Sequence, residues 1–537
     1  APIDTVTQQV EAALRYGGES LQAQLGYYGS FFSNDKDFLQ WQNPYTAAGG
    51  WDPSAGFNCS GATTAAGCGT GQKSLPPDNA FHQILASGGY DLPYQTRATL
   101  STAFGWMEQD DNYLPYSVNS ALTAITPAGA PVQANDPSAL PRRSPDAEIF
   151  TTVVDFRLAS RPLPKLHLDL AYHLDDRDND TPRNVYTRIR GDAEDQDPAR
   201  ARINLPYSFE QHRIDFDAGY QVWRRTDLTL GYQWERTERD FQERDYVTEN
   251  TLDAVLTSHP WAGVSARINY EHSWRDGDRY RGNDPFLDSH VGADPNDFEN
   301  HPLLRKYYLA DRDRDEIQLM LALQPLENLS LGINASYVDE DYDDTDAGLT
   351  KVTGTGSGID LSWTPIERLT THAFYSYQRF ETEQDGWSFF GGGFGFDDPS
   401  RRWDSSDTDR THTVGVGFSW NVLPELSLGA DYLFADSRGD TDVDVGSALD
   451  AGVPYPKTRS RQHNLSLYGE YRFTPNLSTR VGYLYESFSR DDWALDGIAP
   501  TSLSCFPNPN ACVIGSGRAS EGYTASVVSW SVIYKFW

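Results

Sequence analysis

The sequence lacks any long apolar segment and is poor in basic residues. None of its 537 residues falls in an apolar run of the ~18 or more residues that a transmembrane helix requires. Lys and Arg total 44 against 77 Asp and Glu, which gives a formal net charge of -33. A nucleic-acid-binding protein needs a basic surface for phosphates. The composition therefore excludes a membrane-spanning helix and argues against nucleic acid as a partner.

Helical periodicity is lacking as well, and strict alternation of apolar and polar residues takes its place. The stretches 228–235, 264–271, 465–473 and 477–486 alternate in this way. Such alternation indicates β-strands with one apolar face. A closed β-barrel crosses a membrane with strands of this kind, and its mean hydropathy stays low.

The predicted strands are joined by two kinds of connection that alternate along the chain. Short connections carry proline, at 163–165, 324–328, 364–368, 423–425 and 474–476. Long acidic connections span 276–312, 339–353, 381–410, 437–461 and 490–520. Outer-membrane barrels have short periplasmic turns and long extracellular loops. We therefore predict an all-β protein, a large antiparallel transmembrane β-barrel forming a single domain over residues 1–537 in the bacterial outer membrane.

A secreted β-sandwich array or propeller would also show alternation. Its second face would have to form a core or a soluble surface, and here that face is rich in Gly, Ser, Asn, Arg and Glu. The last strand also favours a barrel, because its apolar face ends in aromatic residues, as the outer-membrane assembly signal does. That face comprises Val528, Trp530, Val532, Tyr534 and Phe536.

About 19 or more strands are visible in the pattern. A barrel with both ends in the periplasm needs an even number of strands. We therefore expect that the chain lacks an N-terminal portion of the barrel.

Cysteine is scarce, and the four that occur form two local pairs in Gly-, Pro- and Asn-rich loops. Cys59 lies near Cys68, and Cys505 lies near Cys512. This spacing predicts two disulfides in an oxidising compartment and does not match a zinc site. The motif C-x-x-C-H is absent, so this chain attaches no c-type haem itself.

A barrel of this size has a wide lumen. Its predicted inward faces carry small residues, which would let a second protein approach closely or would simply relieve strand curvature. These are Gly231, Gly332, Gly415, Gly417, Ser419, Ser427 and Gly429. Polar residues on two predicted strands are candidate contacts to a partner in the lumen, with ordinary lumen polarity as the alternative. They are His167, Asp169, His173, Arg267, Asn269 and Glu271.

Acidic clusters follow several strand ends and supply the oxygen ligands that Ca²⁺ prefers. None matches an EF-hand loop, and a solvated acidic rim is the alternative. The candidate ligands are Asp176, Asp178, Asp180, Asp341 and Asp343. No Ser/His/Asp triad is recognisable, and we predict no enzymatic activity.

Six short motifs lie in roughly the first 40% of the chain, at 26–35, 39–45, 77–83, 112–116, 160–166 and 204–208. Together they resemble the MtrB/PioB family of outer-membrane barrels. A Cys-x-x-Cys near the N-terminus, found in some members, is absent here. The family also typically has more barrel before the first of these motifs.

The resemblance implies a barrel that houses and insulates a periplasmic multihaem c-type cytochrome, often with an extracellular multihaem cytochrome docked outside. The function would be electron transfer across the outer membrane (extracellular electron transfer in a porin–cytochrome complex). Haem would be carried by the partner. The alternative is a general or substrate-specific porin, or a plugged solute receptor.

Overall fold

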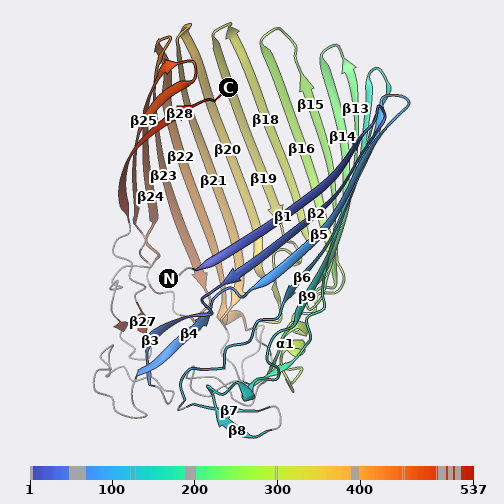
Figure 1. The fold of residues 1–537 in the computed structure, drawn as a ribbon, viewed down its shortest axis with the longest axis vertical. Coiled ribbons are helices and arrows are strands. Elements are labelled where there is room, and N and C mark those ends of the chain that lie inside the picture. The colour runs from blue at the N-terminus through green and yellow to red at the C-terminus, as the bar shows by residue number, and fades with distance from the viewer. Residues whose placement is uncertain are drawn as a thin grey trace. The chain divides into compact units, whose positions relative to one another are not determined.

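The structure, a computed structural model, consists almost wholly of strands, and twenty of them belong to one sheet (Figure 1). No described helix is long and apolar enough to cross a membrane. The residues described are 4–46, 68–120, 122–126, 129–187, 201–296, 298, 300–388, 398–449, 452, 454–491, 493, 503–505, 512–514 and 522–536.

Residues 1–218, 233–250 and 276–302 form one compact unit, here called unit 1. Its long strands are β1 (Thr5–Gly17), β2 (Leu21–Asn34), β5 (Asn79–Leu92), β6 (Thr96–Gln109), β9 (Ala147–Leu163) and β10 (Leu166–Asn179). Its short elements are β3 (Phe38–Thr46), β4 (Cys68–Ser74), β7 (Thr123–Ile125), β8 (Pro131–Gln133), β11 (Val185–Tyr186), β12 (Arg202–Ile203), η1 (Pro137–Ala139) and α1 (Asp284–Ser289).

Residues 219–232, 251–275 and 303–537 form unit 2. Its long strands are β18 (Arg312–Leu326), β19 (Leu329–Asp341), β20 (Ala347–Ile366), β21 (Leu369–Trp387), β22 (Arg402–Leu423), β23 (Leu426–Val445), β24 (Thr458–Thr474), β25 (Leu477–Asp491) and β28 (Tyr523–Tyr534). Its short elements are β17 (Leu304–Arg305), β26 (Leu503–Cys505), β27 (Cys512–Ile514) and η2 (Pro399–Arg401). Four strands contribute residues to both units: β13 (Phe209–Trp223), β14 (Thr226–Arg239), β15 (Tyr246–Ser258) and β16 (Val264–Gly277).

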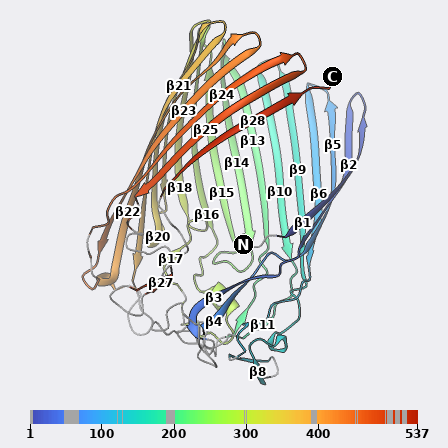
Figure 2. The ribbon, with the colours of Figure 1, turned by 60° about the vertical axis from the view of Figure 1, so that its left-hand side comes forward.

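Successive strands of unit 2 pair antiparallel from β18 through β25, and β25 pairs with β28 (Figure 2). At one end they are joined by hairpin turns at 327–328, 367–368, 424–425 and 475–476. We call this the short-turn end and the opposite one the long-loop end. Two-residue connections fix the register of a hairpin. The predicted short turns and the predicted strand count are both confirmed.

Each unit has an apolar and a polar face, because the register carries the sequence alternation across neighbouring strands. Ile268 of β16 lies opposite Leu319 of β18, and Glu271 lies opposite Glu316. Ile268 and Leu319 are 41% and 44% exposed, respectively. A soluble monomer rarely exposes an extended apolar surface, so this face needs a cover that the described chain does not supply.

The hairpins of unit 2 extend further than the sequence pattern predicts. Much of the predicted loops 339–353, 381–410 and 437–461 is strand, and β21 remains paired with β22 up to Trp387 opposite Arg402. The ladder forms between backbone groups, which pair whatever the side chains are. The loss of apolar residues therefore marks where the apolar face ends, and the strands continue beyond it.

Candidate functional site

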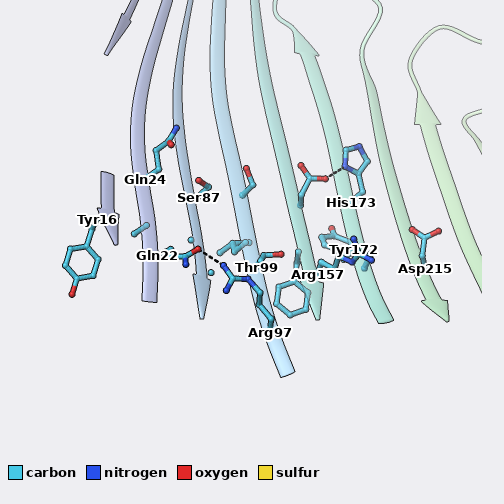
Figure 3. Close-up of a pocket in the computed structure, with 18 of the residues that line it drawn as sticks. Tyr16, Gln22, Gln24, Ser87, Arg97, Thr99, Arg157, Tyr172, His173 and Asp215 are labelled. Atoms are coloured by element: carbon cyan, nitrogen blue, oxygen red, sulfur yellow. Dashed lines mark hydrogen bonds and ion pairs between the residues drawn. The ribbon is translucent and has the colours of Figure 1, made fainter. Parts of the chain in front are cut away.

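A groove with polar and apolar lining lies on unit 1 near the short turns at 18–20, 93–95 and 164–165, and Figure 3 shows residues that line it. Its volume is about 850 Å³. The strand register places one residue of each of six adjacent strands in a row across its floor. This row is Arg15, Gln24, Ser87, Ser101, Asp155 and His173. We call the groove with its polar lining the inner belt.

Hydrogen bonds between strands hold the charged side chains of the inner belt in place. Arg97 donates to Asp91 at 2.7 Å and to Gln22 at 2.6 Å. Arg157 donates through Nε to both carboxylate oxygens of Asp169, each at 2.9 Å. These cations are matched by anions of the same chain, so the belt presents mixed charge and hydrogen-bonding groups to whatever fills the groove.

Of the three residues predicted on β10, His173 lines the inner belt, and Asp169 lies beside it, paired with the lining residue Arg157. Asp169 binds Arg157, and His173 Nδ1 lies 2.7 Å from Asp155 Oδ1. His167 is exposed and lies at a register shift at the start of β10. The structure therefore places Asp169 and His173 on the polar face. It does not test whether they contact a partner.

The other predicted contacts lie on the polar face of β16, within unit 2. Glu271 accepts a hydrogen bond from Arg314 of β18 at 2.5 Å. Arg314 also contacts Glu316, and it donates to Glu340 of β19 at 3.0 Å. Arg267 lines a cavity of about 800 Å³, and the buried Asn269 Oδ1 has no hydrogen-bond partner among the described residues.

The small residues predicted to face inwards occupy the polar face, but neighbouring side chains already cover several of them. A Cβ on Gly332 would lie 2.0 Å from Asp360 Oδ2. One on Gly415 would lie 2.1 Å from the Phe374 ring. These glycines make room for side chains of adjacent strands. They therefore give no independent sign of a second backbone in the lumen.

The predicted Ca²⁺ ligands are not gathered into one cage. Asp176 and Asp178 lie on β10, with Asp180 just beyond it, and Asp341 is 3.0 Å from Lys351 Nζ. Asp343 is exposed in the turn after β19. Within the described ranges, no three His, Cys, Asp or Glu side chains are placed to hold a metal ion. Calcium binding remains a prediction from the sequence.

The cysteines fall largely where only the backbone is described. Cys505 and Cys512 are directly opposite in the β26–β27 ladder, and Cys68 is opposite Thr46. Cys59 lies outside the described residues. Both disulfides stay predictions.

Sequence reasoning missed a repeated arrangement on the apolar face towards the long-loop end. A tyrosine hydroxyl is hydrogen-bonded to the Nδ1 of a histidine on the next strand of the ladder, at 2.8 to 2.9 Å. The pairs are Tyr27–His82, Tyr172–His212, Tyr375–His412 and Tyr432–His463. Each tyrosine and its histidine belong to different strands, and only the register brings them together.

Comparison with known proteins assigns the family. Residues 1–536 match the family model described as outer membrane beta-barrel porin, MtrB/PioB. The chain belongs to this family. It is 28% identical to the outer membrane protein MtrB of Shewanella baltica (strain OS185), over 99% of this chain and 67% of that protein.

Two solved structures with TM-scores below 0.5 are also similar to this chain. The FrpB iron transporter of Neisseria meningitidis (F3-3 variant) is 12% identical, with a TM-score of 0.47 over 90% of this chain and 67% of that one. The siderophore receptor PirA of Acinetobacter baumannii is 9% identical, with a TM-score of 0.41 over 90% and 73%.

Membership of the MtrB/PioB family indicates what each face of the sheet contacts. The protein is a β-barrel of the bacterial outer membrane, as the sequence predicts. In such barrels the apolar side chains face lipid and the polar ones face the interior. The inner belt and the Arg314 cluster, which is Arg314 with Glu271, Glu316 and Glu340, therefore face the interior. The Tyr–His pairs face outwards.

Proposed function

We propose that this barrel is a sheath that houses and insulates a periplasmic multihaem c-type cytochrome and so enables electron transfer across the outer membrane. An extracellular multihaem cytochrome would complete the route. The observation that carries the proposal is the match to the MtrB/PioB family over residues 1–536. In this proposal the barrel contributes the insulating wall and the partner contributes the haem.

The chemistry of the inner belt supports the proposal. Charged cofactors and polar backbone are costly in hydrocarbon. A wall that is apolar outside and hydrogen-bonding inside removes this cost for a partner in the lumen. The belt offers polar and charged groups fixed by neighbours, including Arg97, Arg157 and His173. Such fixed groups bind a folded polar surface with less loss of side-chain entropy than free ones.

The decisive experiment is purification of the native protein in mild detergent, followed by a haem absorbance spectrum and subunit masses. A sheath is expected to bring a haem-containing subunit with it. A porin or solute receptor is expected to purify without haem and, in the porin case, to conduct ions freely in planar bilayers. Purification without any haem protein would refute the sheath.

A charge-swap variant tests whether the inner belt contacts the partner. R157D/D169R keeps the local ion pair and the net charge but exchanges the positions of cation and anion. We expect the co-purifying haem to fall several-fold while the barrel remains folded. The matched control swaps the pair Arg142 and Asp146, which are 2.8 Å apart and lie outside the belt. Equal haem in both variants would show that the partner does not bind at this belt.

A further inference from the structure

Four arginines lie side by side on the outward face of unit 2, at its long-loop end. The register sets Arg379 of β21 opposite Arg410 of β22, Arg410 opposite Arg438 of β23, and Arg438 opposite Arg459 of β24. All four follow the apolar alternation of their strands. We call them the arginine row. Their side chains are 36 to 58% exposed.

Like charges directly opposite across a ladder destabilise a sheet. Three carboxylates offset part of this repulsion. Asp436 accepts from Arg438 and Arg459, Asp440 from Arg410, and Glu381 from Arg379.

Positive charge still exceeds negative charge at this level. Arg461 and Lys457 add two cations beside the row, and Asp491, opposite Arg459, adds one carboxylate. Six cations thus face four carboxylates, an excess of two positive charges on a chain of net charge -33. The exposed guanidinium groups of the row can therefore donate hydrogen bonds to additional anionic acceptors.

The height of the row matches the level of lipid headgroups. Ten residues separate Leu369, at the start of β21, from Arg379. At ~3.4 Å per residue and a tilt of about 45°, this distance is roughly 24 Å across the membrane. The apolar band of an outer-membrane barrel is about 25 Å tall.

Aromatic residues directly below the row mark the same boundary. Tyr375 and Tyr377 are the preceding outward residues of β21, and His412 and Phe434 occupy neighbouring strands. Aromatic girdles of this kind mark the membrane interface. Beyond the row carboxylates predominate on the same face, and the cation Arg402 there is paired with Asp385. The acidic residues there are Glu383, Asp385, Asp404, Asp442 and Asp444.

We propose that the arginine row is a binding site for the phosphate groups of an outer-leaflet lipid, of the bisphosphorylated lipid A type. Guanidinium groups bind phosphate oxygens through paired, charge-assisted hydrogen bonds. A row of four spans adjacent strands on the side that faces lipid, so a diphosphorylated headgroup can engage more than one arginine. An acidic soluble protein would not require its binding site to lie at the level of the lipid headgroups. The proposal is independent of any cytochrome.

The test uses native mass spectrometry of the detergent-purified protein with bisphosphorylated lipid A, its dephosphorylated form, or inorganic phosphate. We expect wild type to retain the bisphosphorylated lipid and R410Q/R438Q to retain at least tenfold less. The matched control, R472Q/R480Q, removes the same charge from β24 and β25 and should retain as much as wild type. R410K/R438K keeps the positive charge but lacks the planar guanidinium group, and it should retain an intermediate amount of the bisphosphorylated lipid.

Several outcomes would overturn the proposal. Among the variants, these are equal lipid retention by R410Q/R438Q and wild type, or equal loss of lipid in R472Q/R480Q and R410Q/R438Q. Among the ligands, they are equal binding of the bisphosphorylated and dephosphorylated lipids, or displacement of lipid by millimolar inorganic phosphate. An acidic protein bound in place of lipid would also overturn the proposal. Heat-modifiable migration on gels checks that each variant is folded. If R410Q/R438Q does not fold, the comparison of R410K/R438K with wild type decides by the same criteria.

Discussion

The two faces of unit 2 carry opposite charge balances near the long-loop end. On the inward face, Arg314 is surrounded by Glu271, Glu316 and Glu340, with side chains 17 to 30% exposed. On the outward face, the arginine row outnumbers its carboxylates. One sheet therefore presents anions to the interior and cations to the membrane interface.

The difference shows that net charge says little about what any one surface binds. A formal net charge of -33 predicts that the protein repels anionic lipid. The register gathers arginines from four strands into one outward row, and the local field there is set by neighbours within a screening length of ~10 Å. Three variants test this contrast.

The largest effect is expected from R314M on the inward face. Removing the cation leaves three partly buried carboxylates close together, with Arg312 near only Glu340 of the three, and the loss of the charged hydrogen bonds should cost about 3 kcal/mol. The free energy of unfolding, measured with urea in detergent micelles, should fall by this amount. R267M removes an exposed arginine from the same face of β16 and should cost less than about 0.5 kcal/mol. Similar losses in the two variants would show that the Arg314 cluster contributes no specific stability.

A smaller effect, dependent on the surrounding lipid, is expected from D436N on the outward face. Asp436 accepts from Arg438 at 3.0 Å and from Arg459 at 2.6 Å, and its side chain is only 10% exposed. Losing these charged hydrogen bonds should cost about 2 kcal/mol in neutral detergent. Bisphosphorylated lipid should reduce this cost, because lipid phosphates would then bind the arginines. An identical cost with and without the lipid would contradict this account of the outward face.

The smallest effect concerns Tyr342, which lies in the turn between β19 and β20 and donates a hydrogen bond to Glu340 at 3.0 Å. Burial, and secondarily Glu340, raises the pKa of the Tyr342 hydroxyl. The folded state holds this proton more tightly than the unfolded chain. Its contribution to stability is therefore complete below pH ~10 and is lost as the pH rises through the raised pKa.

Y342F should lower the free energy of unfolding by about 1 kcal/mol at pH 8. It should also remove the part of the alkaline loss that is due to this residue. Thermal unfolding followed between pH 8 and pH 11 measures both effects. Parallel pH profiles for wild type and Y342F would show that Tyr342 does not contribute to the alkaline loss.

The fold was largely predictable from the sequence, because alternation fixes which face of a strand is apolar and short turns fix its neighbours. The strand ends were less predictable: residues 381–387 and 402–410 appear as acidic loop in the sequence but pair as strand. The site was predictable only within single strands. Asp169 and His173 share a strand, so their common face could be predicted. The arginine row could not, because its members are 21 to 31 residues apart along the chain and only the register aligns them.

The covered glycines have a consequence for the bore of the barrel. A methyl group on Gly429 would lie 2.3 Å from the ring of Tyr468, which also stacks against Arg480 at 4.3 Å. Substituting alanine at this position would push the ring, and the cation resting on it, towards the central passage. The width available to a partner in the lumen therefore depends on glycines that lie opposite large side chains of adjacent strands. One added carbon atom at such a glycine would narrow the passage by displacing the opposite side chain.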